Sequence, residues 1–281
     1  MKIIKKLLGQ TIGSTHRDSQ GEKLPKEILE HICKPRQSRS PISQEHKAEK
    51  RSIGYMDNFR VVPDPKASGE WFLIADVYFT EEPDDIDFEL GGFSWSITEI
   101  IKEFSSKEGN YAIYLPYPFY NNKKMLNDLS NRDKYLSLGR WYKKSVDPAT
   151  VSLAVSFILF ALSPIWTKVF DSRIWPNIKK LCKRIPELRN KGIQRVDFVQ
   201  ISKIKSHQVS IHFIPEANKE KACFSKTKMK NGFNTVYKHS KGDPKSKNPG
   251  YHVVKLYWES EREEYKVFHI EYKDGTDINI A

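Results

Sequence analysis

PATVSLAVSFILFALSPIWT, residues 148–167, is the stretch on which the fold of this chain depends. It contains no charged residue, although 29% of the chain is charged. Asp147 can cap the free backbone N–H groups of a helix, and Pro148 suits the first helical position. We therefore predict a helix over 148–167, which Pro164 should kink or end within a turn.

Two interpretations of this helix stay open. Twenty helical residues rise about 30 Å, the thickness of the hydrocarbon core of a bilayer, so the segment is long enough for one membrane span. Trp141 and Trp166 flank it as interface residues do, but basic residues lie on both sides and set no orientation. Alternatively, Ser152 and Ser156 belong to a stripe of small residues that lets a buried helix pack closely in an α+β core.

The amino-acid composition indicates a globular protein from a reducing compartment. A chain of 281 residues with 38% hydrophobic residues can build one large or two small domains with a real core. Its three cysteines, Cys33, Cys182 and Cys223, are far apart and odd in number, which favours a reducing compartment over a disulfide framework. We expect a cytoplasmic protein, associated with a membrane if the hydrophobic segment inserts.

The hydrophobic pattern predicts an α+β chain in four parts. These are an N-terminal segment with a flexible linker (1–52), a mixed α/β domain (53–145), the central hydrophobic helix (146–171), and a basic helix followed by an antiparallel β domain (172–281). Residues 1–8 read as a short basic amphipathic helix or as a first strand.

The mixed domain combines strand and helix signals. Residues 53–62 and 70–80 are predicted strands. Ser96 and Glu99 form a capping box that predicts a helix, and 125–142 is also predicted to be helical.

The C-terminal part combines one basic helix with several strands. Residues 172–192 have an apolar side and a strongly positive remainder, which is typical of a basic amphipathic helix, and Pro186 should break this helix. The predicted strands that follow are 194–201, 208–214, 251–258, 265–273 and 277–280.

Charge points to a partner class. The net charge is +12, and residues 140–250 alone hold 23 basic against 7 acidic residues. Such a block suits a polyanion: nucleic acid, an anionic membrane surface or an acidic protein partner. A solvated basic surface without a partner is the simpler alternative.

Two segments supply the candidate polyanion-binding residues. The basic helix suits a phosphate backbone or anionic headgroups. Residues 216–250 carry nine lysines among aromatic residues and predict a long loop in which aromatic rings stack on the bases of a single strand. The candidates are Arg173, Lys179, Lys180, Lys183, Arg184, Lys226, Lys228, Lys230, Phe233, Tyr237 and Lys238.

Catalytic motifs are scarce. The sequence lacks GxSxG, HExxH, paired CxxC, Walker A and GxGxxG patterns, so it predicts no catalytic residue, metal ligand or cofactor. One enzyme hypothesis is kept. The E-x-K pairs Glu264/Lys266 and Glu271/Lys273, with Asp243 upstream, resemble the pattern of PD-(D/E)xK nucleases, which would imply a metal-dependent nuclease. On an exposed strand, E-x-K is ordinarily a cross-strand charge pattern.

The sequence is therefore consistent with three functions. The first is a non-enzymatic binding or accessory protein that engages a polyanion, nucleic acid above all, through the basic helix and the lysine-rich loop. The alternative is a membrane-associated effector or anchor that inserts 148–167, and the second alternative is the metal-dependent nuclease.

Overall fold

The chain forms two compact units. The computed structural model describes residues 3–18, 21–33, 39–43, 52–80, 96–105, 111–130, 136–143, 150–155, 168, 170–190, 192–193, 195–216 and 219–280. Unit 1 comprises Met1–Ile97, Tyr142–Asp147 and Asp274–Asp277, and unit 2 comprises Thr98–Trp141, Pro148–Lys273 and Ile278–Ala281. This division falls within the predicted 53–145 domain.

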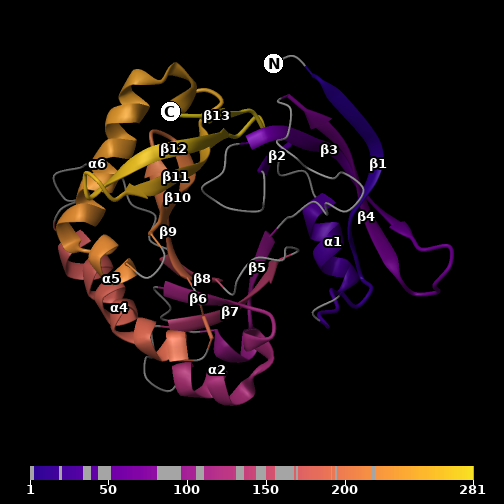
Figure 1. Ribbon diagram of the computed structural model, residues 1–281, viewed down its shortest axis with the longest axis horizontal. Helices are drawn as coiled ribbons and strands as arrows, with labels where there is room; N and C mark the ends of the chain where they lie inside the picture. The colour runs from indigo at the N-terminus through magenta and orange to yellow at the C-terminus, as the bar shows by residue number, and fades with distance from the viewer. Residues whose placement is uncertain are drawn as a thin grey trace. The chain divides into compact units, whose positions relative to one another are not determined.

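Unit 1 is built on a four-stranded antiparallel sheet with the strand order β1-β4-β3-β2 (Figure 1). Its strands are β1 (Lys5–Ser14), β2 (Ser40–Ser43), β3 (Ser52–Pro63) and β4 (Trp71–Phe79), and helix α1 (Lys26–Cys33) packs on β3 and β4. The two predicted strands are confirmed as β3 and β4. On β4, every second residue from Leu73 to Phe79 is buried, which is the period of a strand with one face in a core.

The second sheet has nine strands in the order β13-β12-β11-β10-β9-β8-β6-β7-β5. These strands are β5 (Ser96–Ile100), β6 (Tyr111–Pro116), β7 (Leu136–Lys143), β8 (Thr150–Val155), β9 (Arg195–Ile204), β10 (His207–Ile214), β11 (Tyr251–Glu259), β12 (Glu264–Tyr272) and β13 (Asp277–Asn279). The predicted C-terminal strands are confirmed as β9 to β13, and the α+β class is confirmed by the mixture of helices and strands. The predicted antiparallel arrangement of this part is wrong for β10 and β11, which pair in parallel.

Three pairs of neighbouring strands run parallel: β6 with β7, β8 with β9, and β10 with β11. Parallel neighbours need a crossover connection, usually with a helix. The three connections contain α2 (Lys123–Ser130), α4 (Trp175–Asn190), and α5 (Glu220–Cys223) with α6 (Lys226–Gly242), respectively. Short turns of helix lie at η2 (Lys102–Phe104), η3 (Phe119–Asn121), η4 (Phe170–Ile174) and η5 (Pro244–Ser246). Helices α4 and α6 line one side of β9–β12 in Figure 1.

The predicted central helix is wrong for residues 150–155, which form strand β8 between β6 and β9. A strand paired on both sides in a sheet interior is apolar throughout, so an uncharged run does not distinguish it from a buried helix. Residues 156–167 lie outside the described residues. In the described part of the chain, no helix is long and apolar enough to cross a membrane.

Three further predictions are corrected. The capping box at 96–99 lies on strand β5, and the predicted helix 125–142 ends early because Leu136–Lys143 pairs with β6 as β7. The predicted loop over 216–250 contains α5 and α6. Ser225 caps the N-terminus of α6, and its hydroxyl accepts a hydrogen bond from the Lys228 backbone N–H at 3.3 Å.

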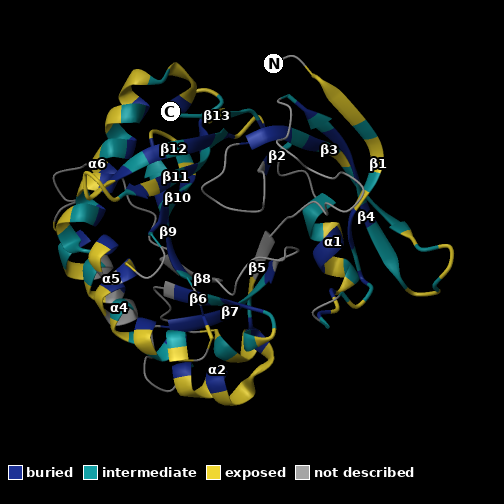
Figure 2. Ribbon diagram, viewed as in Figure 1, coloured by how far each residue is buried: buried dark blue, intermediate teal, exposed yellow. Residues whose placement is uncertain are grey.

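An aromatic core joins α6 to the sheet. The ring centroid of Phe213 on β10 lies 4.8 Å from that of Phe233 and 4.9 Å from that of Tyr265. Gly232 makes this approach possible, because a Cβ atom at that position would lie 2.6 Å from Cε1 of Phe213. In Figure 2, most of β9–β12 is coloured as buried or intermediate.

Candidate polyanion-binding surface

The predicted residues of the basic helix have different surroundings. Lys179 and Lys183 are exposed on α4. Arg184 is half-buried, and its Nη1 donates to the backbone oxygen of Leu129 at 2.9 Å, which ties α4 to the end of α2. The backbone of Arg173 lies in η4 and that of Lys180 in α4.

Three predicted lysines at the start of α6 are ion-paired within the fold. Lys226 Nζ lies 3.2 Å and Lys230 Nζ 3.5 Å from carboxylate oxygens of Asp171. Lys228 Nζ lies 3.1 Å from Glu263 Oε2 and 4.7 Å from the centre of the Trp258 ring. Burial by itself would raise the pKa of Asp171, but the two lysines outweigh it and lower that pKa. Part of the predicted binding charge is therefore neutralised by acidic residues of the chain.

The aromatic half of the predicted site does not fit base stacking. Phe233 is 1% exposed and packs among core rings, including Phe170 at 6.0 Å. Tyr237 is half-buried, and Lys241 Nζ lies 4.5 Å from its ring centre. The expected single-strand arrangement on a loop is wrong at Phe233, because a core side chain is closed to a base.

An exposed stripe runs along α6. Its members share one side of the helix because they are spaced by three and four residues, and they are Thr227, Asn231, Asn234, Lys238 and Lys241. The first three are uncharged hydrogen-bonding residues and the last two are basic. We call this set the α6 stripe.

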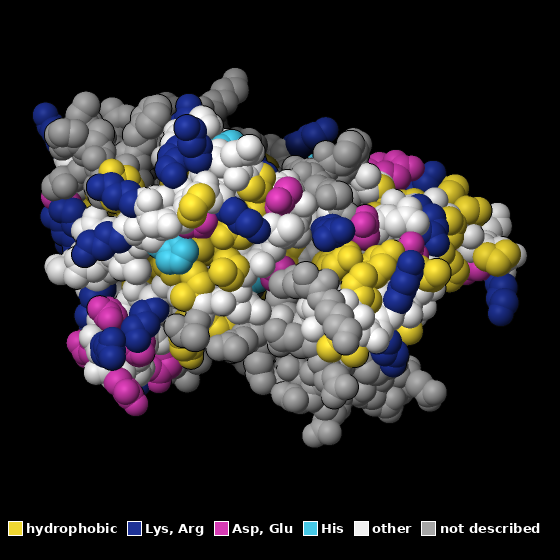
Figure 3. Space-filling model, turned by 90° about the horizontal axis from the view of Figure 1, so that it is seen from above, with side chains coloured by type: hydrophobic (Ala, Val, Ile, Leu, Met, Phe, Trp, Pro, Cys, Tyr) yellow, Lys and Arg dark blue, Asp and Glu magenta, His cyan; other side chains and the backbone are white. Residues whose placement is uncertain are grey.

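Two further exposed lysines, Lys245 and Lys247, follow the α6 stripe in and after η5. Lys245 Nζ lies 4.9 Å from the ring centre of Tyr272. On the face drawn in Figure 3, Lys and Arg side chains stand in several separate groups among polar and apolar residues. The densest described run of exposed lysines in α6 and η5 therefore lies at the C-terminal end of the helix.

A second charged cluster lies on the sheet itself. Lys255 on β11 pairs with Glu271 on β12 at 3.2 Å, and both side chains are largely buried. His269 Nδ1 lies 2.9 Å from Asn279 Oδ1, and its Nε2 lies 3.5 Å from Glu271. Burial would raise the pKa of Glu271, but Lys255 and His269 outweigh it and hold that pKa well below its usual range.

His212 extends this cluster onto β10, where it lies in register with Lys255. Burial lowers the pKa of His212 to about 4, with Lys255 and His252 acting in the same direction and Glu271 against it. The imidazole is therefore neutral at pH 7. The cluster joins three strands, with the Lys255–Glu271 ion pair between β11 and β12 and the neutral His212 beside Lys255 on β10.

The geometry separates the residues of the nuclease pattern. Tyr272 donates its hydroxyl to Asp243 Oδ2 at 2.9 Å, and Glu271 is the residue before Tyr272 on β12. Since successive strand residues point to opposite faces, Asp243 and Glu271 lie on opposite sides of β12. Lys266 pairs with Glu259 on β11 at 2.5 Å, which is a cross-strand charge pair. Among the described residues, no three His, Cys, Asp or Glu side chains gather as a metal site.

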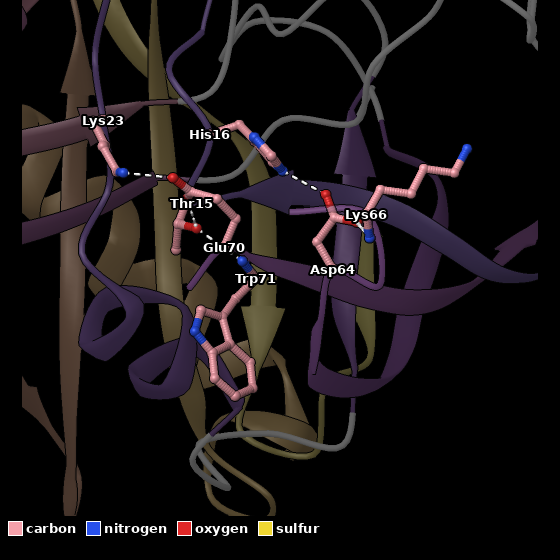
Figure 4. Close-up of polar contacts among 7 residues, drawn as sticks. All are labelled: Thr15, His16, Lys23, Asp64, Lys66, Glu70 and Trp71. Atoms are coloured by element: carbon pink, nitrogen blue, oxygen red, sulfur yellow. Dashed lines mark hydrogen bonds and ion pairs between the residues drawn. The ribbon is translucent and has the colours of Figure 1, made fainter. Parts of the chain in front are cut away.

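Unit 1 holds a polar network between β1 and the start of β4 (Figure 4). Thr15 donates its hydroxyl to Glu70 and accepts from the Trp71 backbone N–H at 2.8 Å. Lys23 Nζ donates to Glu70 at 2.5 Å, and His16 Nε2 lies 2.8 Å from Asp64. Every group in this network is matched by a partner that fixes β1 or the β3–β4 turn, so it is best explained as structural.

A row of aromatic and cationic side chains crosses the unit 1 sheet, and sequence reasoning missed it. Lys6 Nζ lies 5.0 Å from the Tyr78 ring centre, Tyr78 stacks on Tyr55 at 4.9 Å, and Arg39 lies 4.3 Å from the Tyr55 ring centre. The four residues come from four separate stretches of sequence. Only strand register brings them together, so spacing along the chain carried no signal.

Comparison with known proteins finds no match for this chain among protein-family models, curated proteins or solved structures.

Proposed function

We propose that this protein is a binding protein for a polyanion, with nucleic acid as the ligand, and that the α6 stripe is its contact surface. The observation that carries the proposal is the exposed side of α6, on which three hydrogen-bonding residues lead into Lys238 and Lys241. The helix contains five lysines and no acidic residue. Lysines neutralise phosphates, while Asn and Thr donate to phosphate oxygens and base edges.

The paired lysines at the start of α6 are assigned a different role from that of the α6 stripe. Lys226, Lys228 and Lys230 are held by Asp171 and Glu263, so an external phosphate has to compete with a carboxylate already in place. The exposed Lys238, Lys241, Lys245 and Lys247 can each meet a phosphate directly. Contact with three or four phosphates of a duplex gives a salt dependence with a slope of roughly −3 to −4.

The test measures binding of a fluorescent short DNA duplex and a single strand across a salt series. Lys238→Glu/Lys241→Glu should weaken binding at least tenfold and reduce the slope by about two. Lys66→Glu/Lys102→Glu is the matched control, since it makes the same change in net charge at two exposed lysines that are not part of α6.

Equal losses in the two variants would show that overall charge, not the α6 stripe, controls binding. No retention of either nucleic acid at low salt would refute the proposal. Vesicles of phosphatidylcholine with phosphatidylserine form the third arm. Binding to vesicles alone, lost in Lys238→Glu/Lys241→Glu, would transfer the surface to the membrane alternative.

A further inference from the structure

Strand β1 is the edge of the unit 1 sheet, and only β4 pairs with it among the described strands. The start of β1 and the two residues before it form the most exposed apolar segment that the structure describes. Ile3 is 45%, Ile4 52% and Leu8 58% exposed, and the exposed half of β1 is visible in Figure 2. The register with β4 is regular over Lys5–Leu7 and shifts between Leu7 and Gln10. Exposed aliphatic side chains along this open edge mark a segment that can accept another strand.

The exposed side chains lie on both faces of the sheet. Lys5 and Lys6 are consecutive residues of β1 and therefore point to opposite faces. Ile3 and Ile4 directly precede β1, and the Ile4 N–H donates to the Phe79 carbonyl oxygen of β4 at 2.8 Å. Lys6 lies on the face of Tyr78. A membrane or a nucleic acid laid on the sheet would cover one face only. An added strand covers both, because its own side chains alternate between the faces.

The order of side chains indicates what the added strand carries. Residues 3–8 read IIKKLL, two aliphatic residues, two lysines and two aliphatic residues. Self-pairing of two copies across this region sets lysine beside lysine, which disfavours it. An incoming segment with two acidic residues between aliphatic pairs instead matches charge and apolarity on both faces.

We infer that the open edge of β1 binds an extended acidic–aliphatic segment of a partner protein as an additional strand. Backbone hydrogen bonds to β1 hold the segment, the acidic pair contacts Lys5 and Lys6, and the aliphatic pairs cover Ile3, Ile4 and Leu8. This interaction surface belongs to unit 1 and does not depend on the α6 stripe.

Binding of synthetic peptides to the full-length protein tests the inference. A fluorescent peptide TVIEEIVT should bind, and TVIKKIVT should not. The Lys5→Glu/Lys6→Glu variant should reverse this preference, with at least a tenfold change in Kd for each peptide. Leu8→Ser should weaken the acidic peptide about tenfold, while Ile278→Ser, which changes an exposed aliphatic residue of β13, should leave it unchanged.

Backbone pairing is tested with two N-methylated forms of TVIEEIVT, one modified at its odd and one at its even positions. Because alternate N–H groups of a strand point to opposite edges, only one form should lose binding. Equal binding by both forms, or no binding of the unmodified peptide, would overturn the inference. So would a dimer in sedimentation that Leu8→Ser dissociates, since the edge would then be occupied by a second copy. Binding of phosphatidylserine vesicles or single-stranded DNA that Leu8→Ser abolishes, without peptide binding, would also overturn it.

Discussion

Replacing Gly232 by alanine should destabilise the protein, whereas the same change at Gly242 should stabilise it. Both glycines lie in α6, where alanine is the better helix former by about 1 kcal/mol. Their surroundings differ. A Cβ atom at Gly232 would lie 2.6 Å from Cε1 of Phe213 and 3.2 Å from Cβ of Tyr265, while nothing lies within 4 Å of one at Gly242.

The size of the effect follows from these distances. Carbon atoms in contact are normally about 3.5–4.0 Å apart, so the Phe213 ring or α6 has to move by roughly 1 Å. Overpacking of this kind costs about 1–3 kcal/mol, which exceeds the gain in helix propensity. We expect Gly232→Ala to lose about 1 kcal/mol of unfolding free energy and Gly242→Ala to gain about 0.5 kcal/mol.

Urea unfolding followed by far-UV circular dichroism measures both variants. The midpoints should shift in opposite directions without a change in the slope of free energy against urea. Adding Phe213→Leu should recover part of the loss in Gly232→Ala and none of the gain in Gly242→Ala. If Gly232→Ala is as stable as the parent protein, α6 does not pack against β10 through Gly232, and a different side of the helix faces solvent.

Three other predictions concern the charged groups. Lys255→Met should cost about 3 kcal/mol in urea unfolding, because it leaves Glu271 buried without its cation, and a second change, Glu271→Leu, should recover most of that loss. The low pKa of His212 means that the unfolded chain binds the proton more readily. The neutral His212 imidazole therefore contributes at most about 3 kcal/mol to the unfolding free energy, a contribution that is complete above pH 6.5 and is lost as the pH falls towards 4. His212→Gln should flatten that part of the curve of stability against pH, and an unchanged curve would contradict this prediction. Asp171→Asn frees two lysines of α6, so duplex binding should tighten and become more dependent on salt; unchanged binding would show that those lysines do not reach the ligand.

Local patterns predicted α4 and strands β9 to β13 of the C-terminal half. Strands β9 to β12 alternate apolar and polar residues, and their burial alternates in the same way along most of their length. The basic helix was found because its apolar residues recur at helical spacing. The predicted break near Pro186 is wrong, because α4 continues through that residue to Asn190. These signals depend on neighbours a few residues apart, so they are readable from one chain.

The central stretch failed because its meaning depends on distant partners. Residues 150–155 pair with β6 and β9, whose residues lie some forty positions away on either side. Neither strand is visible from the apolar run itself. In α6, the dense lysines concealed a helical signal that the sequence does contain: Met229, Phe233 and Val236 recur at spacings of four and three and are buried together.

The candidate site was only partly predictable for the same reason. The sequence shows where positive charge is concentrated, but not which lysines meet a carboxylate. Asp171 and Glu263 neutralise the start of α6 from positions 55 and 35 residues away from Lys226 and Lys228, respectively. The sequence shows how many acidic residues there are, but only the fold shows which lysine each of them contacts.

The helix dipole explains why the lysines at the start of α6 have acidic partners while those near its end are exposed. Positive charge at a helix N-terminus opposes the exposed N–H groups there, so Lys226 and Lys228 are favourable only with an acidic partner, which the fold supplies. At the C-terminal end, Lys238 and Lys241 lie near the negative end of the helix dipole, which favours cations. These lysines need no carboxylate from the chain and can keep their charge exposed. The end of α6 is therefore where the fold most readily leaves cations available for an external anion, and this is the physical basis for assigning the binding surface to the α6 stripe.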